Sequence, residues 1–200
     1  MSRSRSTEAG QSRGKRPSPT NQIRIVGGEC RGRRLIFPDS PGLRPTSDRT
    51  RETLFNWLQP ILPGAVCLDL FAGSGALGFE AASRGARHVT LVEHNPKVAR
   101  QLQDNQQLLG LEQLSLQQGD ALSWLEQKAT AFDIVFLDPP FADQLLSECC
   151  LKLDQNGWLA NNPRIYLEWD LNGPMPKIPA HWQALKEKKA GQVAYALYTR

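Results

Sequence analysis

The sequence lacks any apolar run long enough to cross a membrane. None of its hydrophobic stretches approaches the roughly 18 residues that a spanning helix needs, and the charged start of the chain has no apolar segment of the signal-peptide kind. We therefore expect neither a membrane protein nor a secreted one, and the cytoplasm is the expected location.

Cysteine and histidine are scarce. The chain has 4 cysteines, which form no CxxC pair, and 3 histidines, which show no metal-ligand spacing. The one vicinal pair, Cys149–Cys150, is not enough for a disulfide scaffold or a zinc knuckle, so we expect a reducing compartment and no metal.

Charge is divided unevenly along the chain. Residues 1–51 contain 12 Lys and Arg against 4 Asp and Glu, a net of +8, whereas residues 52–200 contain 12 against 16, a net of −4. A basic front end on an acidic body predicts a polyanionic partner held at one end. Residues 1–22 are rich in Ser, Arg, Gly and Pro, so we expect them to form a disordered basic tail; a merely solubilising tail is the alternative.

Alternating strands and helices are predicted after this tail. Residues 23–26 and 33–37 flank a glycine-containing link and predict a hairpin, which with its loop makes up residues 23–45. Thr46 or Ser47 can cap a helix that reaches Leu58. Buried strands are then expected at 65–70, 88–93, 114–118, 132–137 and 164–169, separated by helices, before a terminal hairpin over 182–188 and 192–199. This pattern predicts an α/β, Rossmann-like parallel sheet with helices on both faces over residues 46–200, with ligands at the carboxyl ends of its strands.

A glycine-rich turn follows the first of these buried strands. The run from Gly73 to Gly78 reads GxGxxG, which by itself indicates a dinucleotide. Asp69 at the strand end changes this interpretation, because a carboxylate beside a helix N-terminus repels a pyrophosphate. The ammonium and sulfonium groups of S-adenosylmethionine are cationic and suit Asp69, and the glycines would let the backbone approach that cofactor.

Two further acids follow the next strands. Glu93 lies 18 residues after Gly75 and can accept both hydroxyls of a ribose, which fits NAD and S-adenosylmethionine equally. Asp120, in Gly119-Asp120-Ala121, can accept from an adenine amino group or cap a helix, and the two roles are compatible.

The most specific pattern is Asp138-Pro139-Pro140-Phe141, directly after an apolar strand. An exocyclic amino group is a poor nucleophile because its lone pair is delocalised into the ring. The Asp138 carboxylate and the Pro139 carbonyl can accept its N–H bonds, the prolines stiffen the loop, and Phe141 offers a face for a flipped-out base. These residues predict methyl transfer to such an amino group.

The sequence as a whole resembles a known family. The residues that carry the resemblance are Ile25-Val26-Gly27-Gly28, Arg31-Gly32-Arg33, Leu43-Arg44-Pro45-Thr46, the run from Arg51 to Leu58, the run from Leu68 to Gly78, and Ala190-Gly191-Gln192-Val193. Over residues 23–199 they are similar to the bacterial 16S ribosomal RNA guanine-N(2)-methyltransferases, the RsmD family of class I S-adenosylmethionine-dependent enzymes.

This resemblance implies a seven-stranded sheet with an N-terminal hairpin extension, and methylation of the 2-amino group of one guanine in 16S rRNA, within a 30S subunit or an assembly intermediate. The expected catalytic residues are Asp138, Pro139, Pro140 and Phe141. The expected cofactor residues are Asp69, Phe71, Ala72, Gly73, Ser74, Gly75, Glu93, Asp120 and Ala121. From the charge pattern we expect RNA contacts from Arg31, Arg33, Arg34, Arg44, Arg49 and Arg51, on the same side of the sheet as Asp138.

Other functions remain open at this point. An adenine 6-amino methyltransferase uses the same kind of loop, although about 140 residues leave no room for the separate recognition domain of the DNA enzymes. A carbon-5 pyrimidine methyltransferase needs a cysteine nucleophile beside a strand-end proline, which is missing. Asp69 disfavours an NAD-dependent oxidoreductase, and the intact Asp138 loop disfavours an RNA-binding protein without catalysis.

Overall fold

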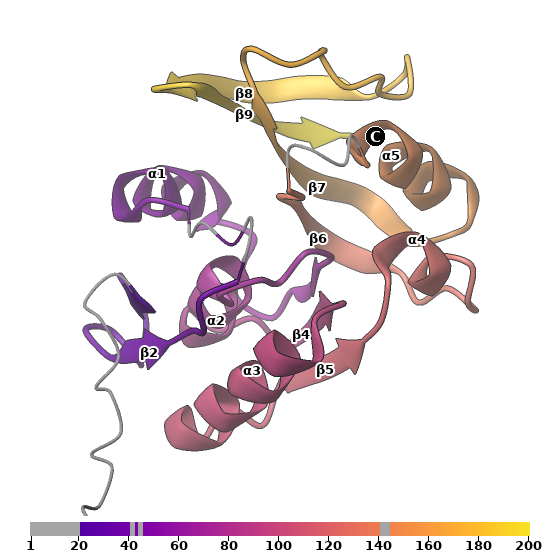
Figure 1. The fold of residues 1–200 in the computed structure, drawn as a ribbon. Coiled ribbons are helices and arrows are strands. Elements are labelled where there is room, and N and C mark those ends of the chain that lie inside the picture. Colours follow the sequence, from indigo (N-terminus) through magenta and orange to yellow (C-terminus); the bar gives the residue numbers. More distant parts are fainter. Residues whose placement is uncertain (1–20, 41–42, 44–45, 141–144) are drawn as a thin grey trace, which may run out of the picture.

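A seven-stranded sheet forms the centre of the computed structural model, which describes residues 21–40, 43, 46–140 and 145–200 (Figure 1). Its order is β5-β4-β3-β6-β7-β9-β8. The bounds are β3 (Val66–Asp69), β4 (His88–Glu93), β5 (Leu114–Gln118), β6 (Phe132–Leu137), β7 (Leu159–Asp170), β8 (Gln183–Ala190) and β9 (Val193–Thr199). The strands from β5 to β7 are parallel, and β9 is antiparallel to both of its neighbours. The predicted Rossmann-like α/β class is confirmed.

Helices cover both faces of this sheet (Figure 1). One face carries α1 (Asp48–Leu58), α2 (Ala76–Ser83) and α3 (Pro96–Leu109), and the other carries α4 (Ala121–Trp124) and α5 (Leu146–Gln155). Successive strand residues enter different cores: Phe136 and Tyr166 pack on the α1–α3 side, and Val135 and Ile165 on the α4–α5 side. Because both faces are covered at the centre of the sheet, β6 is apolar except for Asp133.

The helix caps and the strand β7 show how local chemistry sets the element ends. Ser47, not Thr46, caps α1, with its hydroxyl accepting from the Thr50 N–H. Asn95 caps α3, where Pro96 takes the first helical position, as predicted. The strand β7 starts five residues before the predicted Arg164, because an irregular register opposite Phe132 and Ile134 accommodates Asn162 at a φ of 62°.

The predicted N-terminal hairpin is present. The strands β1 (Gln22–Arg24) and β2 (Arg34–Ile36) pair antiparallel, and Ile23, Ile25 and Leu35 pack into the core on the α1–α3 side. The structure does not describe residues 1–20, so the expectation of a disordered tail lies outside the described residues. Among those that it describes, no helix combines the length and apolar character needed to cross a bilayer.

Candidate functional site

A cavity of about 920 Å³ lies at the carboxyl ends of the strands. Its described lining has no Lys or Arg and six carboxylates: Asp69, Glu93, Asp120, Asp138, Glu168 and Asp170. Four of these acids, Asp69, Glu93, Asp138 and Glu168, each come two positions after a strand residue that packs on the α1–α3 side. Because side chains alternate between the two faces of a strand, these four acids point toward the same face. A cavity lined in this way attracts a cation and repels a pyrophosphate.

Asp69 connects the end of β3 to the first turn of α2. Its side chain is buried, and Oδ2 accepts from the Gly78 N–H at 2.9 Å, which satisfies a helix donor that has no partner within the helix. Burial raises the pKa of Asp69 to about 7. A Cβ on Gly78 would lie 2.1 Å from Leu91 Cδ2, so this glycine permits close packing of α2 on β4.

Some residues of the glycine loop line the cavity, and others pack against the core. Phe71, Ala72, Gly73 and Ser74 line the cavity, as predicted for cofactor residues. Gly75 does not line it: its φ is +80°, and a Cβ there would meet the Phe79 ring at 2.4 Å. The turn and the packing beneath it explain why residue 75 is a glycine, and its contact with the cofactor stays a prediction.

Glu93 fixes the same loop from the neighbouring strand. Its buried carboxylate accepts from Gly73 N–H at 2.9 Å and from Asn95 N–H at 2.8 Å, one bond to each oxygen. A carboxylate oxygen has two acceptor positions, so Oε2 keeps one for a ligand hydroxyl, whereas His94 Nδ1 lies 3.3 Å from Oε1.

Asp120 is the N-cap of α4. Its Oδ1 accepts from Ser123 N–H at 2.9 Å, and this hydrogen bond is the main cause of the lowered pKa of Asp120. Asp120 and Ala121 also line the cavity, so the cap and the predicted ligand contact remain compatible.

The predicted catalytic loop lies at the end of β6. Asp138, Pro139 and Pro140 line the cavity, whereas Phe141 lies outside the described residues. Thr46 Oγ1 donates to Asp138 Oδ2 at 3.0 Å, a contact that ties the start of α1 to this loop and that the sequence did not predict. Desolvation, and then the charge of Glu168, raise the pKa of Asp138 well above its ordinary value, and the Thr46 bond opposes part of this rise.

Glu168 is a site residue that sequence reasoning missed. Leu137 on β6 pairs with Leu167 on β7, so the next residues, Asp138 and Glu168, are neighbours across the two strands. Glu168 is 7% exposed, and its Oε2 accepts from the Tyr166 hydroxyl at 2.6 Å. Burial raises the pKa of Glu168. An acid within the otherwise apolar stretch from Ile165 to Trp169 was the available signal.

Arg51 was predicted to bind RNA, and the structure contradicts this. Its side chain is 1% exposed; Nη2 donates to the Arg24 carbonyl and pairs with Asp48, and Nη1 lies 3.7 Å from Glu80. A guanidinium enclosed in this way cannot reach a phosphate.

Two other arginines were predicted to bind RNA near the start of α1. Arg49 is exposed on the first turn of α1, and Arg44 lies outside the described residues.

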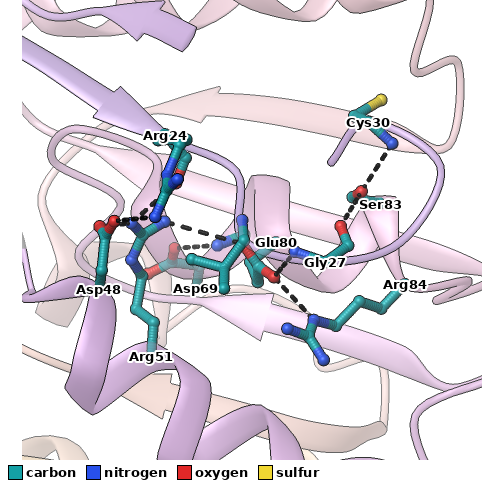
Figure 2. Close-up of polar contacts among 11 residues, drawn as sticks. Arg24, Gly27, Cys30, Asp48, Arg51, Asp69, Glu80, Ser83 and Arg84 are labelled. Atoms are coloured by element: carbon teal, nitrogen blue, oxygen red, sulfur yellow. Dashed lines mark hydrogen bonds and ion pairs between the residues drawn. The ribbon is translucent and has the colours of Figure 1, made fainter. Parts of the chain in front are cut away.

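The link between the hairpin strands is held against α2 (Figure 2). Glu80 accepts from Val26 N–H at 2.8 Å and Gly27 N–H at 2.7 Å, while the Ser83 hydroxyl donates to the Gly27 carbonyl and accepts from Cys30 N–H. Both acceptors belong to the last turns of α2, so the link lies at the end of that helix.

Arg31, Arg33 and Arg34 are exposed on or beside this link, and Arg33 donates to the Leu108 carbonyl at 3.3 Å, near the end of α3. The hairpin thus packs on the face toward which Asp138 turns. However, α2 and α3 start at the cavity and run back against the strands, so the link lies at the opposite edge of the sheet. These arginines therefore lie on the same side of the sheet as Asp138, as predicted, but at the edge of the sheet opposite the cavity.

A second basic surface was missed. Lys186, Lys188 and Lys189 belong to β8, whose residues are all exposed, and the turn that follows lines the cavity with Gly191 and Gln192. The run Lys-Glu-Lys-Lys was the available signal for this surface.

Several known proteins are similar to this chain in sequence and in fold. A model of the family described as conserved hypothetical protein 95 matches residues 23–199. The ribosomal RNA small subunit methyltransferase D of Escherichia coli K12 is 52% identical over 183 residues, 92% of each chain. The protein of that name in Haemophilus influenzae is 46% identical over 186 residues, 91% of this chain and 96% of that one.

Solved structures agree. The Escherichia coli protein yhhF has a TM-score of 0.84 at 50% identity, over 90% of this chain and 98% of that chain. An RNA methyltransferase from Salinibacter ruber, in complex with S-adenosyl-L-homocysteine, shares the fold with a TM-score of 0.61 at 15% identity, over 78% of this chain and 93% of that chain. The chain therefore belongs to the conserved hypothetical protein 95 family, which is the RsmD family of class I S-adenosylmethionine-dependent methyltransferases.

Proposed function

We propose that this protein methylates the exocyclic 2-amino group of one guanine in the 16S rRNA of the small ribosomal subunit. The observation that carries the proposal is Asp138, held by Thr46 at the end of β6 and flanked by Pro139 in a cavity lined with carboxylates. The names of the Escherichia coli and Haemophilus influenzae relatives support a small-subunit rRNA substrate.

The cavity divides into two parts along the sheet. Asp69 and Glu93 are the last residues of β3 and β4, Asp120 comes two residues after β5, and we assign this part to the cofactor. S-adenosylmethionine supplies an electrophilic methyl group on a sulfonium, and its cationic groups fit a lining without Lys or Arg. Glu93 would hold the ribose hydroxyls and Asp69 would face the cationic end. Asp138 directly follows β6 and Glu168 lies near the end of β7, and we assign this part to the base.

Asp138 has two roles in the proposed reaction. Its carboxylate accepts one N–H of the amino group, and the Pro139 carbonyl accepts another, which directs the nitrogen lone pair at the methyl carbon. The new N–C bond would form as the methyl–sulfur bond breaks, with the sulfur keeping the electron pair as a thioether. The nitrogen must then lose one proton, and Asp138 is placed to accept it. The raised pKa of Asp138 makes the ionised carboxylate a stronger base.

The positions of the basic side chains favour an extended substrate. Arg31 and Arg34 lie at the opposite edge of the sheet from the cavity, whereas Arg49 and the lysines of β8 lie nearer to it. The six residues of β4 separate the two edges by about 20 Å at ~3.3 Å per residue. An RNA that contacts both edges at once must extend over at least this distance, and a 30S subunit or an assembly intermediate would present such a surface.

An adenine 6-amino methyltransferase is the second candidate, because the Asp138 loop serves either amino group. Mass spectrometry of small-subunit rRNA from cells with and without the protein separates the two. We expect the loss of one N(2)-methylguanosine in cells that lack the protein; loss of an N(6)-methyladenosine would refute the guanine assignment.

A further inference from the structure

The Asp138 loop alone does not distinguish guanine from adenine, and Glu168 is the acid beside it on the neighbouring strand. The strand register places the two carboxyls side by side, and both line the part of the cavity that the base would enter. The charge of Glu168 contributes to the raised pKa of Asp138, after desolvation by burial.

Glu168 is held so that one of its oxygens is free. Tyr166 occupies Oε2 at 2.6 Å. No described residue donates a hydrogen bond to Oε1. The buried side-chain atoms that have neither a hydrogen-bond partner nor contact with solvent are two nitrogens of Arg51, and Oε1 is not one of them. Oε1 is therefore open to the cavity, and the Tyr166 bond keeps the carboxylate in place.

The two purines differ at this position. Guanine presents two donors on one edge, N1–H and the 2-amino group, whereas adenine presents the 6-amino donor beside N1, which is an acceptor. Two neighbouring carboxylates match two neighbouring donors, and a carboxylate opposite an unprotonated N1 leaves two acceptors facing each other at a desolvated site.

We propose that Glu168 is a specificity residue that accepts the N1–H of guanine while Asp138 engages the 2-amino group. The inference rests on the proposed function, because it identifies the group that selects the base in the same cavity. A purely structural Glu168 would need only the Tyr166 bond and would be indifferent to the group at N1 of the target.

The test compares two targets with one amino group in common. Small subunits are reconstituted with either guanine or 2-aminopurine at the position that the wild-type protein modifies. 2-Aminopurine keeps the 2-amino group, lacks O6 and has an acceptor at N1. We expect wild-type protein to favour guanine at least about tenfold in kcat/KM, the scale of one well-placed pair of base contacts. For Glu168→Gln, whose amide can donate to N1, the guanine preference should fall by about tenfold or more.

The control is Asp170→Asn, which removes a carboxylate from the same strand and the same cavity. Its preference for guanine should equal that of the wild type. The preference is a ratio within one variant, so a smaller folded fraction cancels, and the missing O6 affects all variants alike.

Three outcomes are distinguishable. A tenfold loss of preference in Glu168→Gln alone supports the inference. An unchanged preference in Glu168→Gln, with N(2)-methylguanosine as the wild-type product, overturns the inference and leaves the proposed function intact. N(6)-methyladenosine as the wild-type product overturns the proposed function and the inference with it.

Discussion

Removing the carboxylate of Asp138 should slow methyl transfer far more than it weakens cofactor binding. Asp138→Ala takes away the acceptor for one amino N–H and the group that receives the departing proton. Losing one positioned polar group in a desolvated site costs at least ~100-fold in rate, or about 2.7 kcal/mol of transition-state stabilisation. Because the part of the cavity assigned to the cofactor is lined by Asp69 and Glu93, S-adenosylmethionine affinity should fall much less.

Thr46 provides a graded version of the same perturbation. It donates one hydrogen bond to Asp138 Oδ2 at 3.0 Å, so Thr46→Val should slow the reaction about fivefold, the equivalent of ~1 kcal/mol. Since Thr46 acts through Asp138, the double variant should be no slower than Asp138→Ala.

The assay is single-turnover transfer of a labelled methyl group to small subunits that lack the modification, with calorimetry of cofactor binding on the same preparations. A rate near that of the wild type for Asp138→Ala would refute the catalytic role. If the two substitutions slowed the reaction independently, so that the double variant was about fivefold slower than Asp138→Ala, Thr46 would not act through Asp138.

Four further expectations concern the cofactor, the pH dependence, the RNA and the fold. Glu93→Ala should weaken S-adenosylmethionine binding by roughly 1–3 kcal/mol in calorimetry, because the ribose hydroxyls and the Gly73 N–H lose their acceptor; an unchanged affinity would remove Glu93 from the site. The pKa of Asp69 is about 7 in the folded protein and ~3.9 when unfolded. Between these two pH values Asp69 carries a proton in the folded state but not in the unfolded state, so the free energy of unfolding falls as the pH rises toward 7. Asp69→Asn should therefore gain stability relative to the wild type between pH 5 and 8 in urea titrations, and a constant difference would contradict the raised pKa. The triple variant of Arg31, Arg33 and Arg34 to alanine should keep its cofactor affinity while its salt slope for RNA binding falls by about three units; an unchanged slope would place the RNA elsewhere. Glu80→Ala leaves buried Arg51 without this partner and two backbone N–H groups without an acceptor, so the free energy of unfolding should fall by roughly 3–5 kcal/mol, and a loss below 1 kcal/mol would show that the hairpin docks without it.

Local chemistry determined which strands the sequence could predict. The strands β4, β5 and β6 begin and end where predicted, and clear signals mark their ends: Glu93 closes β4, Gly119 follows β5 and Asp138 follows β6. The first half of β7 escaped prediction because Asn161-Asn162-Pro163 is typical of a turn. Pairing with β6 overrides that preference, and Asn162 takes a positive φ to allow it.

The same distinction applies to the site. Asp69, Glu93 and Asp138 were predictable, since each directly ends or follows a strand and such acids converge at one edge of a parallel sheet. Glu168 and Thr46 were not, because their roles depend on the register between β6 and β7 and on the contact between α1 and the Asp138 loop. Arg51 shows the converse error: a charge count includes an arginine but not its burial, and its neighbour Glu80 is 29 residues away.

The helix α2 connects the two functional ends of the molecule. Its first turn is held by Asp69, beside the predicted cofactor loop, and its last turns carry Glu80 and Ser83, which bind the hairpin link. Eight residues at ~1.5 Å each make this connection about 12 Å long. The link that carries the arginines is therefore fixed to α2. Its backbone N–H and C=O groups bond to the side chains of Glu80 and Ser83, and these bonds set its distance from the cavity. If RNA is held at that link, the same helix determines which part of the RNA can reach Asp138.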